Sequence, residues 1–244
     1  MNLSEKYANF KNHRIEISKV PADIEQEIIR TFFFNKQNGI FVDVGANHPF
    51  DYSQSYHLEE MGWRGLLIEP LPSYCELLRL NRKATVIQNA CSSEANHKKT
   101  LPLSVAGALS TLEENLVAIG AKKSNDVVYV ETRTLNSILS DNHIDPGFDF
   151  LSIDIEGHEM EMFKGFDMRK WKPKLILLED HVTSHLKHNY MLSHGYQLLL
   201  RTGINSLYVP EDEKYTFSTQ ARLEFFRKYW LGLLGRKIRY RVRS

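Results

Sequence analysis

The ten residues Phe41–Phe50, FVDVGANHPF, contain the feature of this sequence that most constrains the fold. The apolar run up to Val44 has the composition of a buried strand, and it stops at a single glycine. A polar cluster that contains Pro49 follows. Glycine after a buried strand allows a tight turn toward a helix and a close approach by a ligand. The stretch therefore predicts a binding site at the end of a strand.

Strands and helices alternate along the chain on both sides of this stretch. Strands are predicted at 39–44, 65–70, 85–90, 98–105, 126–133, 148–157, 174–180, 196–201 and 206–210. Helices are predicted at 21–36, 53–61, 71–81, 134–141, 158–166 and 182–194. Continuously apolar strands that alternate with helices are typical of a mostly parallel sheet with helices on both faces, the Rossmann-like α/β class. Its ligands bind beyond the carboxyl ends of the strands.

Length and composition predict a globular protein with one main domain. Of 244 residues, 42% are hydrophobic and 25% are charged. We divide the chain into an N-terminal helical extension (1–38), a main domain (39–210) and a basic aromatic tail (211–244). The two cysteines form no CxxC pair, and neither an apolar leader nor a run of about 20 apolar residues is present. We therefore expect reduced thiols and a cytoplasmic location.

The predicted strand ends carry polar residues suited to a nucleoside. Glu69 ends the second strand about 25 residues after the glycine loop, where an acid can accept hydrogen bonds from both ribose hydroxyls. A dinucleotide such as NAD needs three glycines around its pyrophosphate, and this loop has one. S-adenosylmethionine has no phosphate and needs a single close backbone approach. The pattern therefore favours S-adenosylmethionine over NAD.

Several segments together resemble the FkbM-type family of S-adenosylmethionine-dependent O-methyltransferases. They are FVDVGAN, GLLIEPLP, FLSIDIEGHEMEMFKGFD, KPKLILLED and GINSLYVP, within residues 39–210. The resemblance implies a class I methyltransferase fold and methyl transfer to a hydroxyl. It implies acceptors such as a glycan, a lipo-oligosaccharide or a nucleotide sugar, including deoxyhexoses such as fucose or rhamnose, or a non-sugar natural product. One departure is NHPFDYS, where many members have a glycine shortly after GAN.

A set of strand-end residues is assigned to the cofactor. Asp43 is expected to accept backbone N–H bonds from the loop, and Glu69 to bind the ribose. Asn47, Tyr52 and Ser53 either hold the amino acid end or serve only as turn residues. Cys91 and Ser92 are placed near adenine, although Cys91 also suits a small buried position. The full set is Asp43, Gly45, Ala46, Asn47, Tyr52, Ser53, Glu69, Cys91 and Ser92.

A second cluster of acids and histidines is assigned to catalysis. Its members are Asp154, Glu156, His158 and His181. Such residues suit a general base or a divalent cation. The cation is the less favoured alternative, and Asp154 with Asp180 would be its ligands. Glu156 and His158 also suit the N-terminus of a helix without any catalytic role. Ser110 and Thr111 either line an acceptor pocket or belong to a polar lid.

The tail differs in charge from the rest of the chain. Residues 221–244 hold eight Lys or Arg and one Glu, a net charge of +7, which leaves +1 − 7 = −6 for the remainder. On a helical wheel one side carries Leu223, Phe226, Tyr229, Trp230 and Leu233, with Glu224, Arg227 and Lys228 opposite. This pattern suits peripheral contact with the inner face of a membrane, or docking on its own domain or a second copy in a homo-oligomer.

The partners follow from these assignments. We expect a sugar-containing acceptor and no nucleic acid, because the acidic body offers no broad basic surface. A rival interpretation is a non-catalytic module that binds S-adenosylmethionine or a nucleotide and is recruited to membranes by its tail.

Overall fold

The computed structural model describes residues 22–105, 110–112, 126–212, 223, 225–233 and 235. The start of the predicted N-terminal extension, most of the segment 106–125, Glu224 and the last nine residues lie outside this range. The chain divides into two compact units, one formed by residues 37–174 and the other by residues 1–36 with 175–244. Each unit is described by itself.

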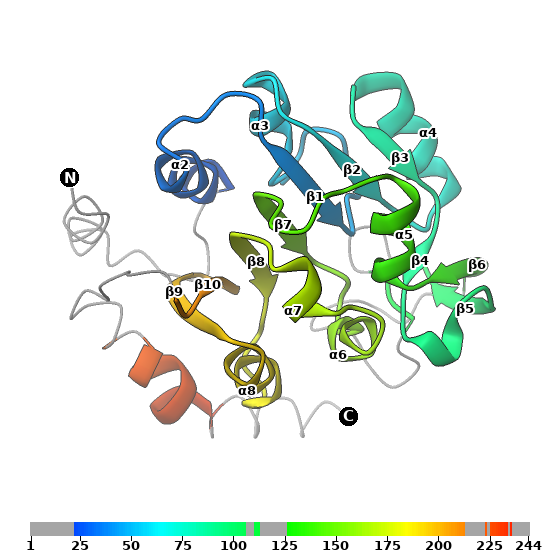
Figure 1. Ribbon diagram of the computed structural model, residues 1–244. Helices are drawn as coiled ribbons and strands as arrows, with labels where there is room; N and C mark the ends of the chain where they lie inside the picture. The colour runs from blue at the N-terminus through cyan, green and yellow to red at the C-terminus, as the bar shows by residue number, and fades with distance from the viewer. Residues whose placement is uncertain are drawn as a thin grey trace. The chain divides into compact units, whose positions relative to one another are not determined.

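The unit 37–174 is built on four parallel strands in the order β3-β2-β1-β7. Their bounds are β1 Ile40–Val44, β2 Arg64–Ile68, β3 Thr85–Ile87 and β7 Phe150–Ile153. Figure 1 shows β1 between β2 and β7. The central strands are buried on both faces, so a nearly continuous apolar sequence is required. The parallel sheet predicted from the sequence is confirmed.

Short helices lie between the strands of this unit and after β7. They are α3 Tyr56–Glu60, α4 Pro72–Asn81, η3 Glu94–Asn96, α5 Leu135–Asp141, α6 Glu159–Phe163 and α7 Met168–Trp171. Pro72 occupies the first turn of α4, where its missing N–H costs no helical bond. The side chain of Thr134 caps α5 by accepting from the Ser137 N–H, at the start of the helix predicted at 134–141. The four-residue helix α7 was not predicted.

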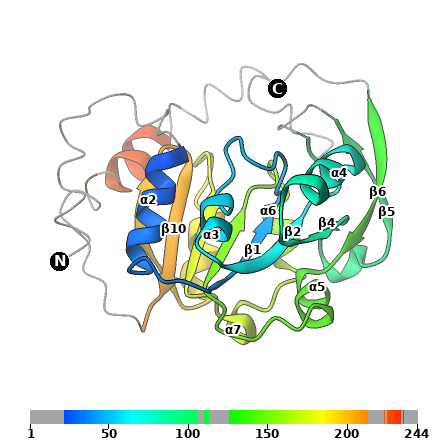
Figure 2. The same ribbon diagram turned by 90° about the horizontal axis from the view of Figure 1, so that it is seen from above.

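A second, smaller sheet lies beside α4 (Figure 2). It has the order β4-β6-β5, with β4 Ala90–Cys91, β5 Thr100–Ser104 and β6 Val127–Arg133. Residues 98–105 and 126–133 were both predicted as strands, and they contain β5 and β6, which form an antiparallel pair. The single strand predicted at 85–90 is wrong. The chain turns after Ile87, where the Asn89 N–H donates to the Ile87 carbonyl. Ala90 then enters the smaller sheet as part of β4 and is buried in a hydrophobic cluster.

The other unit contains α2 Ala22–Phe32, β8 Leu175–Glu179, α8 Leu186–Ser193, β9 Tyr196–Thr202 and β10 Asn205–Pro210. β10 pairs antiparallel with both β8 and β9. Glu25 of α2 is buried and accepts hydrogen bonds from the Thr202 hydroxyl (2.6 Å) and the Asn205 amide. The helix predicted from residue 182 begins only at Leu186, because Val182 has a positive φ of 51°.

The C-terminal segment includes η4 Arg227–Leu231, a π-helical turn. The helical wheel placed Tyr229 on one face with Leu223, Phe226 and Trp230, and this grouping is wrong. Tyr229 is fully buried within its unit, whereas the other three side chains are exposed. Within the described residues, no helix has both the length and the apolar character needed to cross a membrane.

Candidate functional site

The loop after β1 is shaped by the backbone of a neighbouring strand. Gly45 has φ +87°, and a Cβ at this position would lie 1.8 Å from the carbonyl oxygen of Asp154. The Gly45 and Ala46 N–H groups both donate to the Ile68 carbonyl, at 2.9 and 3.1 Å. The sequence predicted glycine here for a tight turn and for the approach of a ligand, and the positive φ fits the turn. The structure adds a further reason, since the chain itself occupies the space that a side chain would need.

Glu69 joins the ends of β1 and β2. Its carboxylate accepts the Asn47 N–H at Oε2 (3.0 Å) and the Leu71 N–H at Oε1 (2.9 Å). The side chain is buried, and this burial raises the pKa of Glu69 to about 7. A carboxylate has about four lone-pair sites, so each oxygen can accept a further hydrogen bond. The group can therefore hold the loop and still receive hydroxyl donors.

Asn47 has a polar atom that lacks a protein partner. Its backbone adopts the left-handed region at φ 47°, which asparagine tolerates better than most residues. Its side-chain oxygen Oδ1 is buried and accepts no hydrogen bond from the described residues. A buried amide oxygen without a donor is uncommon in native proteins. This oxygen suits a ligand that brings an N–H donor, and the ammonium group of an amino acid moiety is such a donor.

Asp43 is held by side chains. Its Oδ2 accepts from the Ser55 hydroxyl at 2.6 Å, and the Ser152 hydroxyl is a second donor. Burial raises the pKa of Asp43 above its ordinary value. The predicted acceptance of backbone N–H groups from the glycine loop is not what the geometry gives. Asp43 instead anchors the segment that leads into α3.

Arg82, which the sequence analysis missed, organises the same segment. Its side chain is fully buried, and Nη1 donates to the Pro49 carbonyl (3.0 Å) and to Ser53 Oγ (3.2 Å). Nη2 donates to Ser55 Oγ at 3.1 Å, and Nε lies 3.3 Å from a Glu59 carboxylate oxygen. Such a planar cation with several donors can fix a whole loop. In the sequence, Arg82 stands among polar residues that predict a solvated helix end.

The two predicted ligands next to this arginine differ in exposure. Tyr52 has φ 60°, and its side chain is 88% exposed. Ser53 is buried, and its Oγ receives hydrogen bonds from Arg82 and from the Tyr56 N–H (3.2 Å). Ser53 therefore shapes the loop, while the side chain of Tyr52 stands at the surface.

Ser92 and His158 bind each other in the interior of the unit. Ser92 Oγ lies 3.0 Å from His158 Nε2 and also accepts from the Asn96 amide at 3.1 Å. Both residues are buried, so His158 serves to tie the end of β4 to the start of α6. Cys91 is buried as well, and burial raises the pKa of its thiol to about 12. This geometry favours the structural alternative for His158 over its catalytic assignment.

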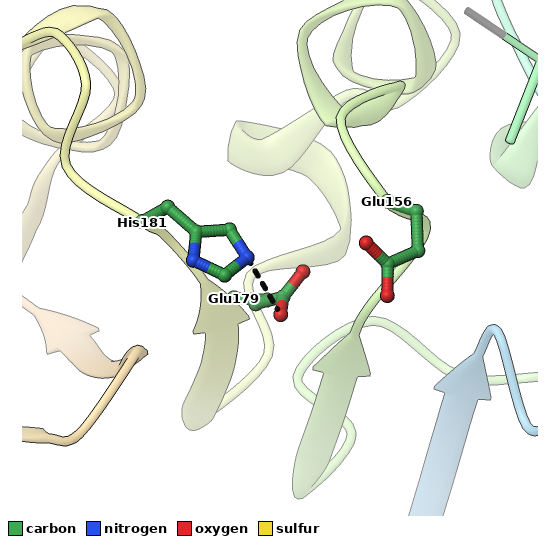
Figure 3. A group of neighbouring side chains, drawn as sticks. All are labelled: Glu156, Glu179 and His181. Carbon is green, nitrogen blue, oxygen red and sulfur yellow. Dashed lines mark ion pairs between the residues drawn. The ribbon is translucent and has the colours of Figure 1, made fainter. Parts of the chain in front are cut away.

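Asp154 and Glu156 follow β7. Asp154 is exposed, and its N–H donates to the Val44 carbonyl at 3.0 Å. Glu156 has φ 50°, and its carbonyl accepts the Thr111 hydroxyl at 2.8 Å. Thr111 is buried by this contact and by its bridge to Ser104. Thr111 therefore supports the turn after β7. Figure 3 draws the Glu156 side chain on this turn.

The end of β8 carries a histidine beside a carboxylate. His181 Nε2 lies 3.3 Å from Glu179 Oε1, the pair marked by the dashed line in Figure 3. Glu179 is buried, whereas about a third of the His181 side chain is exposed. A buried carboxylate orients an imidazole and stabilises its protonated form. The pair is therefore suited to general base chemistry. Glu179 was not among the predicted catalytic residues.

Asp180 is bound on both carboxylate oxygens. Oδ1 accepts the Val182 N–H at 2.8 Å, and Oδ2 accepts the Tyr229 hydroxyl at 2.7 Å. Arg201 donates to the Asp180 carbonyl. These contacts hold the turn that contains His181 and the left-handed Val182, a conformation that a β-branched residue rarely adopts. They give Asp180 a structural role, which does not favour the metal-ligand alternative.

The parallel sheet and Glu69 at the end of β2 define the class of this protein. The chain has a Rossmann-like α/β fold of the class I methyltransferase type. The family model described as the methyltransferase FkbM domain matches residues 43–198. The chain therefore belongs to the FkbM methyltransferase family, as the sequence resemblance predicted. Membership of a methyltransferase family implies S-adenosylmethionine as the methyl donor.

The solved structures similar to this chain include two methyltransferases. The methyltransferase FkbM from Methylobacillus flagellatus KT has 16% identity and a TM-score of 0.45, with 85% of this chain and 60% of that chain covered. The precorrin-6y C5,15-methyltransferase from Geobacter metallireducens GS-15 has 13% identity and a TM-score of 0.41, with 75% and 84% covered. No curated protein matches the chain.

Proposed function

We propose that this chain is an S-adenosylmethionine-dependent O-methyltransferase that methylates a hydroxyl of a sugar in a glycan, lipo-oligosaccharide or nucleotide sugar. The observation that carries the proposal is the buried Glu69 carboxylate at the end of β2, bonded to the loop after β1, in a chain of the FkbM family. The sugar acceptor, with a deoxyhexose such as fucose or rhamnose as the narrower proposal, rests on the family resemblance.

The residues around the glycine loop would hold the cofactor. S-adenosylmethionine, when bound, supplies a methyl group on a positively charged sulfur. Glu69 would accept hydrogen bonds from the ribose hydroxyls through its remaining lone pairs. Asn47 Oδ1, which lacks a donor among the described residues, would accept one from the ammonium group. Asp43 and Ser53 would act by holding the loop, because their side chains are bonded to Ser55 and Arg82.

His181 would act as the general base. Methylation of an acceptor hydroxyl would break the methyl–sulfur bond of the donor, whose electron pair would stay on sulfur, and would release the hydroxyl proton, which His181 would take. Glu179 beside it would stabilise the imidazolium that forms. The exposed carboxylate of Asp154 is the other candidate for this role. His158 is less suited, because its Nε2 lies within hydrogen-bonding distance of Ser92 in the interior.

Calorimetric titration tests the cofactor assignment. S-adenosylmethionine should bind the whole chain, and NADH should not. Glu69→Gln should weaken binding by about 1.5–3 kcal/mol, the range for a hydrogen bond to a charged group. Glu76→Gln, on the exposed side of α4, is the matched control and should leave the affinity unchanged. Binding of NADH instead, or equal affinities for both variants, would contradict the cofactor assignment.

Transfer of labelled methyl groups tests the chemistry. Fucosides and rhamnosides should be labelled at a hydroxyl, and His181→Gln should reduce the rate by about 10²-fold or more while S-adenosylmethionine binding is retained. Asp154→Asn, measured in parallel, identifies the base if His181→Gln has no effect. If both variants retain the full rate, the catalytic assignment is wrong although the cofactor assignment stands.

A further inference from the structure

The C-terminal segment, residues 223–235, has two faces with different surroundings. Its inner face is fixed by Tyr229, whose carbonyl oxygen lies 2.8 Å from His185 Nε2 and whose ring stacks on Phe225 with centroids 4.6 Å apart. His188 packs against both rings. These contacts fix the rotation of the segment and therefore decide which side chains point outward.

The outer face is apolar and uncovered. Leu223, Phe226, Trp230 and Leu231 are 51–67% exposed, although all four are large hydrophobic residues. Positions 223, 226 and 230 follow helical spacing, so they form one stripe. The ring of Trp230 leans on His185 at a centroid distance of 5.5 Å and remains largely exposed. Four such side chains within nine positions form the kind of patch that marks an interaction surface.

Positive charge accompanies this apolar stripe. Arg227 is exposed between Phe226 and Trp230 in the sequence. The residues after Gly235, RKIRYRVRS, add five further cations and no acid, and residues 221–244 together carry +7. Exposed Trp, Phe and Leu beside Lys and Arg are typical of segments that lie in the interface of an anionic bilayer.

We propose that the outer face formed by Leu223, Phe226, Trp230 and Leu231 docks on a membrane surface rich in anionic lipids, with these side chains in the interface and the positive net charge of residues 221–244 favouring anionic headgroups. A second copy of the chain fits less well, because an isologous contact would bring two segments of +7 together. A nucleic acid would use the charge but not the apolar stripe.

Cosedimentation of the full chain with vesicles tests this proposal. The protein should bind vesicles of phosphatidylcholine mixed with phosphatidylglycerol and should not bind phosphatidylcholine alone. Binding should fall as salt is raised, because salt screens the attraction between the cations and the headgroups. Trp230→Ala should lower the partition coefficient by about tenfold, the effect of removing one large interfacial side chain.

Phe34→Ala is the matched control. Phe34 is a large exposed aromatic residue in the same unit but outside the segment, so its removal should leave vesicle binding unchanged. An unchanged circular dichroism spectrum and urea midpoint show that each variant is folded. Three results would overturn the proposal: no binding to anionic vesicles, equal binding by Trp230→Ala, or a dimer that Trp230→Ala dissociates. None of them bears on the methyltransferase proposal.

Discussion

Glu69 and Asp180 look alike in the sequence but are held in different ways. Each is an acid at the end of a buried strand, and each side chain is itself buried. Glu69 accepts two backbone N–H groups, from Asn47 and Leu71. Asp180 accepts one backbone N–H from its own turn and the hydroxyl of Tyr229, a residue 49 positions away.

The two acids differ in whether the residues that hold them lie inside or outside the matched family region. The Glu69 end is held by residues within the matched family region, with Arg82 fixing the segment that precedes α3. The Asp180 end depends on Tyr229, which lies outside that region. The turn that carries His181 is therefore adjustable by sequence changes that leave the loop after β1 untouched.

Gly45→Ala should have the largest effect, because it disrupts the loop after β1, which Glu69 holds. The added Cβ would meet the Asp154 carbonyl, and the positive φ would be strained as well. We expect a loss of about 4 kcal/mol or more in the free energy of unfolding, because losses of this size are typical of severe steric conflict. Urea denaturation measures it.

Gly147→Ala is the control for this change. Gly147 also has a positive φ, 78°, but a Cβ there would meet nothing within 4 Å. The expected cost is about 1–2 kcal/mol, from the left-handed conformation alone. Equal costs for the two variants would show that the contact with Asp154 is not what requires glycine at position 45.

Tyr229→Phe should have a smaller effect and should weaken the turn that contains Asp180 and His181. Burial raises the pKa of Tyr229 to about 12, so the hydroxyl stays protonated and donates to Asp180. Its removal should cost about 1.5–3 kcal/mol of unfolding free energy, as for hydrogen bonds to charged groups. If His181 is the base, the methyl transfer rate should fall while S-adenosylmethionine affinity is unchanged.

Tyr129→Phe controls for the loss of a hydroxyl. Tyr129 is on β6 and is 72% exposed, so its substitution should change the unfolding free energy by less than about 0.5 kcal/mol. If Tyr229→Phe behaves like Tyr129→Phe in denaturation and in activity, the distant support of the His181 turn does not exist.

The pH dependence of cofactor binding should show the smallest effect. The pKa of Glu69 is raised to about 7 by burial, and the ionised carboxylate is the form in which both oxygens accept hydrogen bonds. Below pH 7 the proton must be removed before binding, so the affinity for S-adenosylmethionine should fall by up to about 1.4 kcal/mol per pH unit. Above pH 7 it should level off.

Calorimetry across this pH range measures the slope. Glu69→Gln cannot ionise, so the difference between its affinity and that of the wild type should widen as pH rises toward 7. A constant difference across the range would mean that the titration of Glu69 is not coupled to binding.

The sequence predicted the sheet better than the details of the strand ends. β1, β2 and α4 lie within a residue or two of their predicted bounds, because apolar runs, a glycine and a proline mark them. Glu69 could be predicted because it follows a buried strand about 25 residues after the glycine loop. The break between β3 and β4 depends on a tertiary cluster around Ala90, which no local pattern reveals.

The burial of Arg82 and the burial of Tyr229 could not be predicted from the sequence. Arg82 is a charged residue in a polar run, and only the fold shows that its cation is buried beside Glu59 and Ser55. Periodicity in the tail identified apolar positions but could not tell which of them the body covers. The body covers Tyr229 because Asp180 and His185 provide partners for its hydroxyl and carbonyl.

The pairing of β5 with β6 has a consequence for the connection between these two strands. The two strands are in direct antiparallel register from Thr100 opposite Glu131 to Ser104 opposite Val127. Residues 105–126 connect the two strands, and one of them, Thr111, pairs with Ser104 at the end of β5. Doubling the length of a flexible connection costs only about 0.6 kcal/mol. Thr111 lies in this connection and bonds to Ser104 and to the Glu156 carbonyl, so changes in its length should be nearly neutral for folding only where both contacts of Thr111 are kept.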